Sequence, residues 1–223
     1  VKENKITPVK NQASSGTCWS FSGLGFFESE LLRMGKPEVD LSEMFVVSHS
    51  YSDKADKFVR TNGNINFAAG GSFHDVMYVL KNYGIVPEEQ MNGLNYGEEN
   101  HRHGELDALT GSYVKTLIGN PNKKLSTAWK AGFDGILDAY LGKLPTEFTV
   151  NGKKFTPVTY AQSLGLNMDD YVSLTSFTHH PFYTKFAIEI PDNWRWGESY
   201  NLPLDEFAKV FENAVDKGYT IAW

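Results

Sequence analysis

Residues 11–35, NQASSGTCWSFSGLGFFESELLRMG, contain Cys18, the only cysteine of the chain, at the head of a run rich in aromatic and aliphatic residues. Thr17 and Gly16 are suited to capping a helix that begins at Cys18. Gly35 is suited to the left-handed position that follows a helix end. Because apolar residues occupy nearly every face between these points, the stretch predicts a centrally buried helix.

Gly23 and Gly25 lie inside this predicted helix. Each glycine costs about 1 kcal/mol relative to alanine in a helix interior. Their small side chains therefore indicate that another segment packs closely against the helix.

A lone cysteine is either a small buried hydrophobic residue or a nucleophile. The thiolate is the reactive form, and the unpaired amides at a helix N-terminus stabilise an anion there. The position of Cys18 therefore favours a reactive thiol. An acyl-transfer site also needs donors for the developing oxyanion, and the Cys18 N–H with the Gln12 carboxamide would supply them if residues 13–17 fold back.

The composition is that of a globular protein of one large or two small domains, since the 223 residues are 41% hydrophobic and 22% charged. The formal net charge is −6 and no run of Lys or Arg occurs, so we expect neither a nucleic-acid nor a membrane partner. One cysteine cannot form an internal disulfide, which fits a reducing compartment. We expect a cytoplasmic location, and a periplasmic one stays open because a leader could precede residue 1.

Apolar periodicity and turn residues predict several further elements. They are a helix capped by Ser72 and closed by Gly84, a helix over 129–141, a hairpin over 148–155 that turns on Asn151 and Gly152, and a helix from Leu204 that stops at Gly218. Residues 86–124 read as a long loop with one short helix around Leu106. Residues 171–177, 185–190 and 220–223 have strand composition. Helices early and strands late indicate an α+β protein with two unlike lobes.

PVKNQ (8–12) followed by SGTCWSFS (15–22) resembles the active-site segment of papain-like cysteine peptidases. DLSE (40–43) is similar to a second segment of that family. AGG (69–71) resembles the stretch whose backbone lies along the substrate. The resemblance implies that Cys18 is the nucleophile, that Gln12 holds the oxyanion, and that Gly70, Gly71 and Trp19 bind the peptide substrate. The alternative for the glycine pair is a tight turn before a capped helix.

The resemblance also implies a papain-like two-lobe fold. We expect a helical lobe with the nucleophile helix at 1–100, an insertion with a helix and a hairpin at 101–168, and the first part of an incomplete β-barrel lobe at 169–223. Ser15 stands where secreted members have a second cysteine. SSGTCW (14–19), SLTSFTHHPFY (173–183) and DNWRWGESYNLPLDEF (192–207) resemble the bleomycin hydrolase and aminopeptidase C group. That group implies removal of N-terminal residues inside a ring-shaped homohexamer.

A cysteine peptidase needs an imidazole base and a group that orients it. His179 and His180 are candidates, with Asn193 as the orienting group. However, Pro181 follows them directly, whereas the catalytic histidine of the family leads into an apolar strand. In the family a helix and a barrel strand precede the histidine, and residues 201–223 resemble that helix and strand. We therefore expect the histidine and its asparagine beyond Trp223.

The remaining histidine rings have simpler expected roles. We expect His179 and His180 to pack on Phe182 and Tyr183. Surface positions are expected for the other four histidines, which are His49, His74, His101 and His103.

The leading hypothesis is a cysteine aminopeptidase that needs no metal or other cofactor. The second is a non-catalytic peptide-binding or inhibitory module on the same fold. The third is a metal-dependent hydrolase that uses His101 and His103 with Glu98, Glu99 and Glu105, although this cluster lacks the usual ligand spacing.

Overall fold

The predicted nucleophile helix is α1, Cys18–Arg33, in the computed structural model, which describes residues 3–223. It begins at the predicted residue, and Gly35 follows its end with φ +74°. The helix is largely buried, as expected, and packs against α2 (Glu43–Arg60) and α3 (Phe73–Asn82). The segment 40–43, which resembles a family motif, therefore leads into a long helix that the apolar pattern did not predict.

The two glycines of α1 have different surroundings. A methyl group on Gly23 would lie 2.6 Å from Cγ2 of Val76, so the backbones of α1 and α3 approach closely there. This confirms the expected close packing. The same expectation is wrong for Gly25, because a methyl group there would meet no atom within 4 Å.

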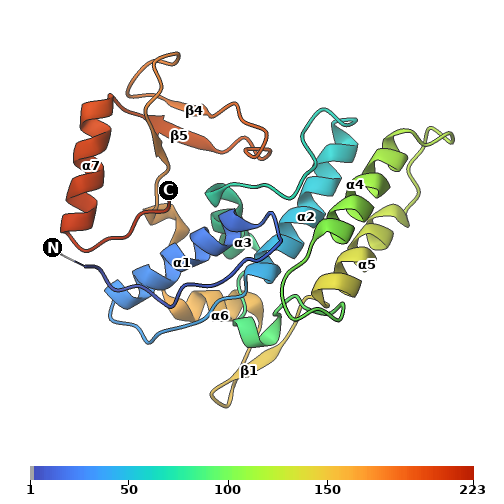
Figure 1. Ribbon diagram of the computed structural model, residues 1–223, viewed down its shortest axis with the longest axis horizontal. Helices are drawn as coiled ribbons and strands as arrows, with labels where there is room; N and C mark the ends of the chain where they lie inside the picture. Colours follow the sequence, from blue (N-terminus) through green and yellow to red (C-terminus); the bar gives the residue numbers. More distant parts are fainter. Residues whose placement is uncertain (1–2) are drawn as a thin grey trace.

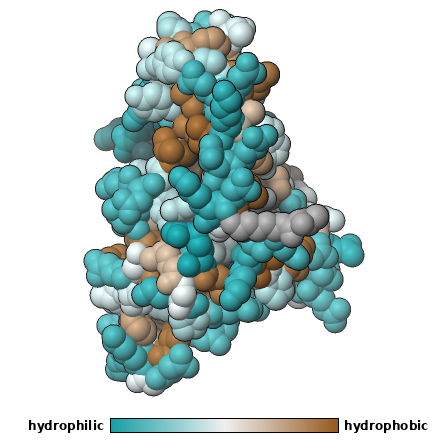
Figure 2. All heavy atoms as spheres, turned by 90° about the vertical axis from the view of Figure 1, so that its left-hand side faces the viewer, coloured by the Kyte–Doolittle hydropathy of each residue, from teal (hydrophilic) through white to brown (hydrophobic). Residues whose placement is uncertain are grey.

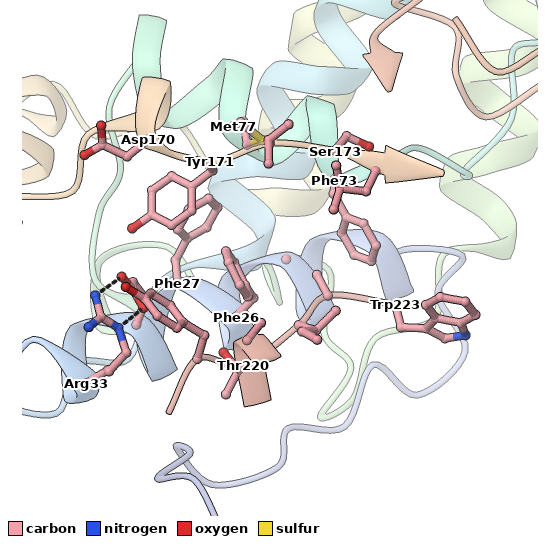
Figure 3. A pocket seen from close by; sticks show the side chains of 18 of the residues that line it. Phe26, Phe27, Arg33, Phe73, Met77, Asp170, Tyr171, Ser173, Thr220 and Trp223 are labelled. Atoms are coloured by element: carbon pink, nitrogen blue, oxygen red, sulfur yellow. Dashed lines mark hydrogen bonds and ion pairs between the residues drawn. The ribbon is translucent and has the colours of Figure 1, made fainter. Parts of the chain in front are cut away.

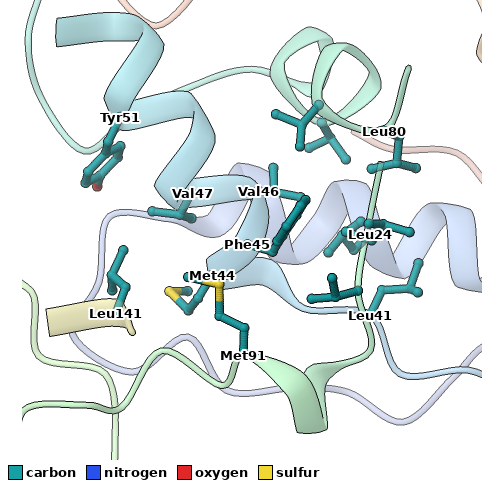
Figure 4. Close-up of a cluster of buried hydrophobic side chains, with 14 of the residues drawn as sticks. Leu24, Leu41, Met44, Phe45, Val46, Val47, Tyr51, Leu80, Met91 and Leu141 are labelled. Carbon is teal, nitrogen blue, oxygen red and sulfur yellow. The ribbon is translucent and has the colours of Figure 1, made fainter. Parts of the chain in front are cut away.

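Helices α1 to α6 form a helical layer, and α7 (Leu204–Asp216) stands to one side of it with the strands between residues 174 and 201 (Figure 1). Beyond the first three helices, the layer contains α4 (Gly104–Ile118), α5 (Trp129–Leu141) and α6 (Pro157–Leu164), with short 3-10 helices at Glu88–Gln90 and Met168–Asp170. A single cluster of buried side chains runs through this layer, from Leu24 of α1 through Phe45 of α2 to Leu141 of α5 (Figure 4). The residues of the predicted insertion thus share the core of the helical lobe, and the domain boundaries stay a prediction.

The helix expected around Leu106 is present, but the long loop predicted over the rest of 86–124 is wrong in part, because α4 is a full helix of 15 residues. Leu106, Thr110 and Val114 lie one turn apart and are buried. The polar and glycine-rich composition hid this stripe, and packing against α2 and α5 supplies the stability that the sequence pattern did not indicate.

Two small sheets complete the fold. The predicted hairpin is confirmed as β1 (Phe148–Val150) and β2 (Lys153–Phe155), and its turn residues Asn151 and Gly152 both have positive φ, as a type I′ turn requires. The second sheet has the order β3-β5-β4, with β3 parallel and β4 antiparallel to β5. Its strands are Leu174–Thr175, Lys185–Ala187 and Glu198–Asn201.

Strands were predicted at the first two of these three places, whereas the central strand β5 was not. The helix predicted from Leu204 is α7, Leu204–Asp216, and Gly218 follows it with φ +93°. Residues 220–223 are not a strand, because no described residue pairs with their backbone. The α+β class with a helical lobe and a separate sheet is confirmed. Among residues 3–223, no helix is both long and apolar enough to span a bilayer.

Gly23→Ala should lower the free energy of unfolding by about 1–2 kcal/mol, since its methyl group overpacks Val76. The matched change Gly135→Ala in α5, where nothing lies within 4 Å, should raise it by about 1 kcal/mol through helix propensity. Urea denaturation of both variants checks the pair. Equal effects of the two substitutions would contradict the close approach of α1 and α3.

Candidate active site

The side chain of Cys18 is exposed at the first residue of α1. The preceding carbonyl, of Thr17, accepts the N–H groups of Ser20 at 2.9 Å and Phe21 at 3.3 Å. Thr17 caps the helix by its backbone alone, because its hydroxyl bonds to the Ser15 hydroxyl at 2.6 Å. The Cys18 N–H has no acceptor among residues 3–223, so the thiol and a free amide donor face the same helix end.

Gln12 folds back toward the residues that precede Cys18, as the short loop predicted. Its Nε2 donates to the Ser15 carbonyl at 2.7 Å, and the Ser15 hydroxyl donates to the Gln12 carbonyl at 2.9 Å. Ala13 sits between them with φ +48°. One N–H of the carboxamide is therefore fixed within the loop, and the other is left for a ligand.

A largely buried ion cluster fastens the extended segment that carries Gln12. Nζ of Lys10 lies 3.0 Å from Glu28 and 2.8 Å from Glu43, and it also donates to the Leu41 carbonyl at 3.1 Å. Glu28 additionally accepts the hydroxyl of Thr7 at 2.7 Å. The segment before the active site is thus tied to α1 and α2 through side chains, although it contains no helix or strand.

Burial governs the charges of this cluster. It raises the pKa of Glu43 to about 7, although the Lys10 ammonium opposes the shift. Burial alone would lower the pKa of Lys10, but the facing carboxylates of Glu43, Asp40 and Glu28 raise it overall. Lys10 therefore stays protonated at neutral pH, whereas Glu43 changes its protonation state near pH 7.

The glycine pair lies directly against the start of α1. A methyl group on Gly16 would lie 2.5 Å from Cβ of Ala69, and one on Gly71 would lie 2.7 Å from the indole of Trp19. Nε1 of Trp19 donates to the Ala69 carbonyl at 3.0 Å. Residues 69–71 can approach Cys18 this closely only because glycines occupy both sides of the contact.

Trp19 is 5% exposed, so its visible role is to support residues 69–71 from below. Its predicted contact with substrate stays a prediction. The N–H groups of Gly70 and Gly71 have no acceptor among the described residues, which leaves them available to an extended peptide.

Lys54 of α2 holds the other side of this segment. Its side chain is 1% exposed, and Nζ donates to the carbonyls of Ala68 at 2.9 Å and Gly70 at 2.5 Å. Burial lowers the pKa of Lys54 to about 8, and the carboxylates of Asp75 and Asp192 oppose the shift. The carbonyl of Gly70 therefore points inward to the ammonium group.

A second ion network joins α2 and α3 to the loop before β5. Arg195 contacts Asp75 through Nε and Asp53 through a terminal nitrogen, each at 2.7 Å. Nε1 of Trp194 donates to the same Asp75 carboxylate at 3.1 Å. This carboxylate also accepts the Ser72 N–H at 2.9 Å, so it caps α3, as predicted, while it anchors residues 190–197.

None of the six histidines, His179 and His180 included, hydrogen-bonds to Cys18 within residues 3–223. His180 stacks on Phe186 with the ring centroids 3.9 Å apart, and its Nε2 lies 2.7 Å from Glu189. The rings of His179 and His180 therefore pack on Phe186 and Phe177, and the expected packing on Phe182 and Tyr183 is wrong.

Asn193 does not orient an imidazole. Its Nδ2 donates to the carbonyls of Ile188 at 3.0 Å and Gly197 at 2.9 Å, and its Oδ1 accepts the Gly197 N–H at 2.9 Å. The carboxamide is consumed by the turn that contains it, and the alternative with His179 or His180 as base loses its orienting group.

The surface positions expected for three other histidines are wrong as well. His101 and His103 are buried beside the loop at Ser14, and burial lowers the pKa of His103 to about 4. His49 stacks on Tyr83 with centroids 4.1 Å apart, and burial lowers its pKa to about 4. Polar neighbours in the sequence concealed this burial.

The proposed metal cluster is not assembled. Tyr140 donates to Glu105, and the His103 ring nitrogens face the interior. In the part of the chain that the structure describes, the group whose candidate ligand atoms all lie within 4.8 Å is His179, His180 and Glu189. There both imidazoles already contact the carboxylate directly.

Two hollows flank α1 on the side of the C-terminal segment. An apolar cavity of about 690 Å³ lies between α1, α3 and α7, lined by Phe26, Phe27, Phe73 and Trp223 among others (Figure 3). A groove of about 820 Å³ includes Gln12 and runs toward residues 219–223. On this side of the molecule, apolar patches interrupt a hydrophilic surface (Figure 2).

Neither Lys54 nor Asp192 was singled out from the sequence, although both contact the glycine segment. Lys54 lies in a polar stretch of α2 that gives no sign of burial. The motif that contains Asp192 was noted only for its resemblance.

A family model described as papain family cysteine protease matches residues 1–130. Human cathepsin L2 is 35% identical over 88 residues, which cover 40% of this chain and 24% of the relative. Aminopeptidase G from Lactobacillus delbrueckii subsp. lactis is 24% identical over 88% of this chain and 54% of its own length. The crystal structure of PepW from Lactobacillus rhamnosis superposes with a TM-score of 0.77 at 22% identity, over 97% of this chain and 58% of PepW. The chain thus spans about half of these longer relatives or less.

Lys10→Met should lower the free energy of unfolding by about 2–3 kcal/mol at pH 7.5, because it leaves Glu28 and Glu43 without a cation. The folded-state pKa of Glu43 is already raised, so its contribution to stability is present below its unfolded pKa and is lost as the pH rises through about 7. Without the Lys10 ammonium the pKa of Glu43 rises further, so more folding stability is lost between low and neutral pH. The destabilisation should therefore be smaller at pH 5 than at pH 7.5.

Urea denaturation at both pH values measures this difference, and the exposed change Lys124→Met serves as the matched control. The assignment fails if Lys10→Met destabilises equally at the two pH values.

Proposed function

Because the chain belongs to the papain family of cysteine proteases, we propose that the protein hydrolyses peptide bonds through a Cys18 acyl-enzyme and acts as an aminopeptidase. The observation that carries the proposal is the arrangement at the start of α1. An exposed thiol, an amide N–H without an acceptor and a fixed carboxamide loop meet beside a backbone segment that is open to a peptide.

In the proposed reaction the Cys18 thiolate attacks the carbonyl carbon of the scissile bond. The carbonyl oxygen becomes an oxyanion, which accepts hydrogen bonds from the Cys18 N–H and from the free N–H of Gln12. Collapse breaks the C–N bond, and the amine leaves with a proton from the imidazolium. Water then attacks the thioester, which releases the carboxylic acid and restores the thiolate.

The imidazole that exchanges these protons is proposed to lie outside residues 1–223. None of the described histidines bonds to Cys18, and His180 with Asn193 makes other contacts. PepW and Aminopeptidase G are longer than this chain. We propose that the segment that carries the imidazole lies in the groove beside Gln12.

The aminopeptidase assignment is supported by the similarity to Aminopeptidase G and by the resemblance to the bleomycin hydrolase and aminopeptidase C group. Membership of that group, a homohexameric ring and a cytoplasmic location are proposals of the same kind. The exposed thiol favours catalysis over a purely peptide-binding module, because binding alone gives no reason to present Cys18 to solvent.

Cys18→Ala in the full-length protein should abolish release of aminomethylcoumarin from aminoacyl substrates. Gln12→Ala should lower kcat by about 100-fold with little change in KM, because it removes one donor that acts on the transition state. Steady-state kinetics measures both effects. Gln162→Ala, at an exposed position of α6, is the matched control and should leave kcat unchanged. Retained activity in Cys18→Ala would rule out the proposed reaction.

A further inference from the structure

The carboxylate of Asp192 lies directly over Gly70. A methyl group on Gly70 would lie 2.3 Å from Oδ1 and 2.8 Å from Oδ2 of Asp192, so the carboxylate occupies the space that any other residue at position 70 would fill. Gly70 belongs to the backbone segment expected to align the substrate. A negative charge is therefore held at the place where an extended peptide would pass.

We infer that Asp192 binds the free α-ammonium group of the substrate and so selects peptides with an unblocked N-terminus. This inference rests on the proposed aminopeptidase function and names the group that would give it its specificity. In this role Asp192 contacts the substrate but takes no part in bond breaking.

The loop that carries Asp192 is firmly held. On one side of the carboxylate, the Asn193 side chain closes the turn with three hydrogen bonds to the backbone and is 4% exposed. Trp194 is 3% exposed and donates to Asp75, and Arg195 joins Asp75 to Asp53. A carboxylate on such a loop keeps its position. Ligand binding then does not have to order the loop, so less conformational entropy is lost on binding.

The charge of Asp192 is left for a ligand from solvent. Asp192 is exposed and makes no hydrogen bond or ion pair with any of residues 3–223. The nearby cations are engaged elsewhere. Arg195 is bound by two carboxylates, and Lys57 lies over the Trp196 ring at 3.4 Å. Lys54 attracts Asp192 electrostatically, but its Nζ donates to the carbonyls of Ala68 and Gly70 and not to Asp192.

An ammonium group fits this position better than an internal peptide does. Asp192 offers acceptors only, and a substrate N-terminus offers three donors and a positive charge. A residue that preceded the bound N-terminus would replace the ammonium group with an uncharged amide, which offers the carboxylate a single donor. The site thus favours an unblocked N-terminus by attraction and disfavours acylated or internal segments, because they would desolvate the carboxylate without bringing it a positive charge.

The test compares two fluorogenic substrates of the full-length protein, one with a free α-ammonium group and one with the same residue N-acetylated. Asp192→Asn keeps the shape of the side chain and removes the charge, and Asp192→Ala removes the group. Asp205→Asn, at an exposed carboxylate in the first turn of α7, is the matched control. The unfolding midpoint of each variant is measured alongside the kinetics.

For Asp192→Asn we expect KM for the free-amino substrate to rise by about tenfold or more, with kcat nearly unchanged. The acetylated substrate should be cleaved as slowly as before or slightly faster, and Asp205→Asn should resemble the wild type. The inference is overturned if either Asp192 variant keeps the wild-type preference, or if it loses activity on both substrates in proportion.

The wild-type protein separates this inference from the proposed function. If the wild type cleaves both substrates equally well, the aminopeptidase assignment itself falls. If it prefers the free-amino substrate and the Asp192 variants retain that preference, the assignment stands and only the role of Asp192 is lost.

Discussion

The contact between the start of α1 and residues 69–71 is the constraint on which the candidate site depends. Gly16 and Gly71 lack the side chains that would keep these segments apart, and Trp19 joins them by a hydrogen bond to Ala69. This approach places a thiol, a helix N-terminus and an open stretch of backbone within one small region. A larger residue at either glycine would separate the nucleophile from the segment expected to position its substrate.

Buried cations hold the irregular parts of the site in place. Lys10 fastens the extended segment that carries Gln12, and Lys54 fastens the segment before Gly71. Neither segment belongs to a helix or strand. Lys54 donates to the backbone carbonyls of its segment at Ala68 and Gly70, whereas Lys10 ties its own segment to Glu28 and Glu43 through its side chain. Buried ion pairs add little stability against apolar packing, but they fix one geometry when each charge is fully partnered. At both places the fixed geometry lies next to a group proposed to act on the substrate.

The sequence predicted the elements whose ends carry strong local signals. The start of α1, the capped helix α3 and the hairpin at Asn151 follow from residues next to one another in the chain, and the structure confirms them. The full length of α4 was missed, because packing and not composition stabilises the helix beyond the short segment expected around Leu106. The burial of His101 and His103 and the roles of Lys54 and Asp192 depend on residues far away in the sequence, for which a local pattern carries no signal.

The central claim is that the exposed Cys18 at the start of α1 is the reactive nucleophile of the protein, at a helix end whose unpaired amides can stabilise an anion. The most direct measurement is the rate at which iodoacetamide alkylates Cys18 in the full-length protein at pH 6, followed by mass spectrometry of the peptide that contains it. The account predicts alkylation at least about tenfold faster than that of free cysteine under the same conditions. A rate no faster than that of free cysteine would contradict it.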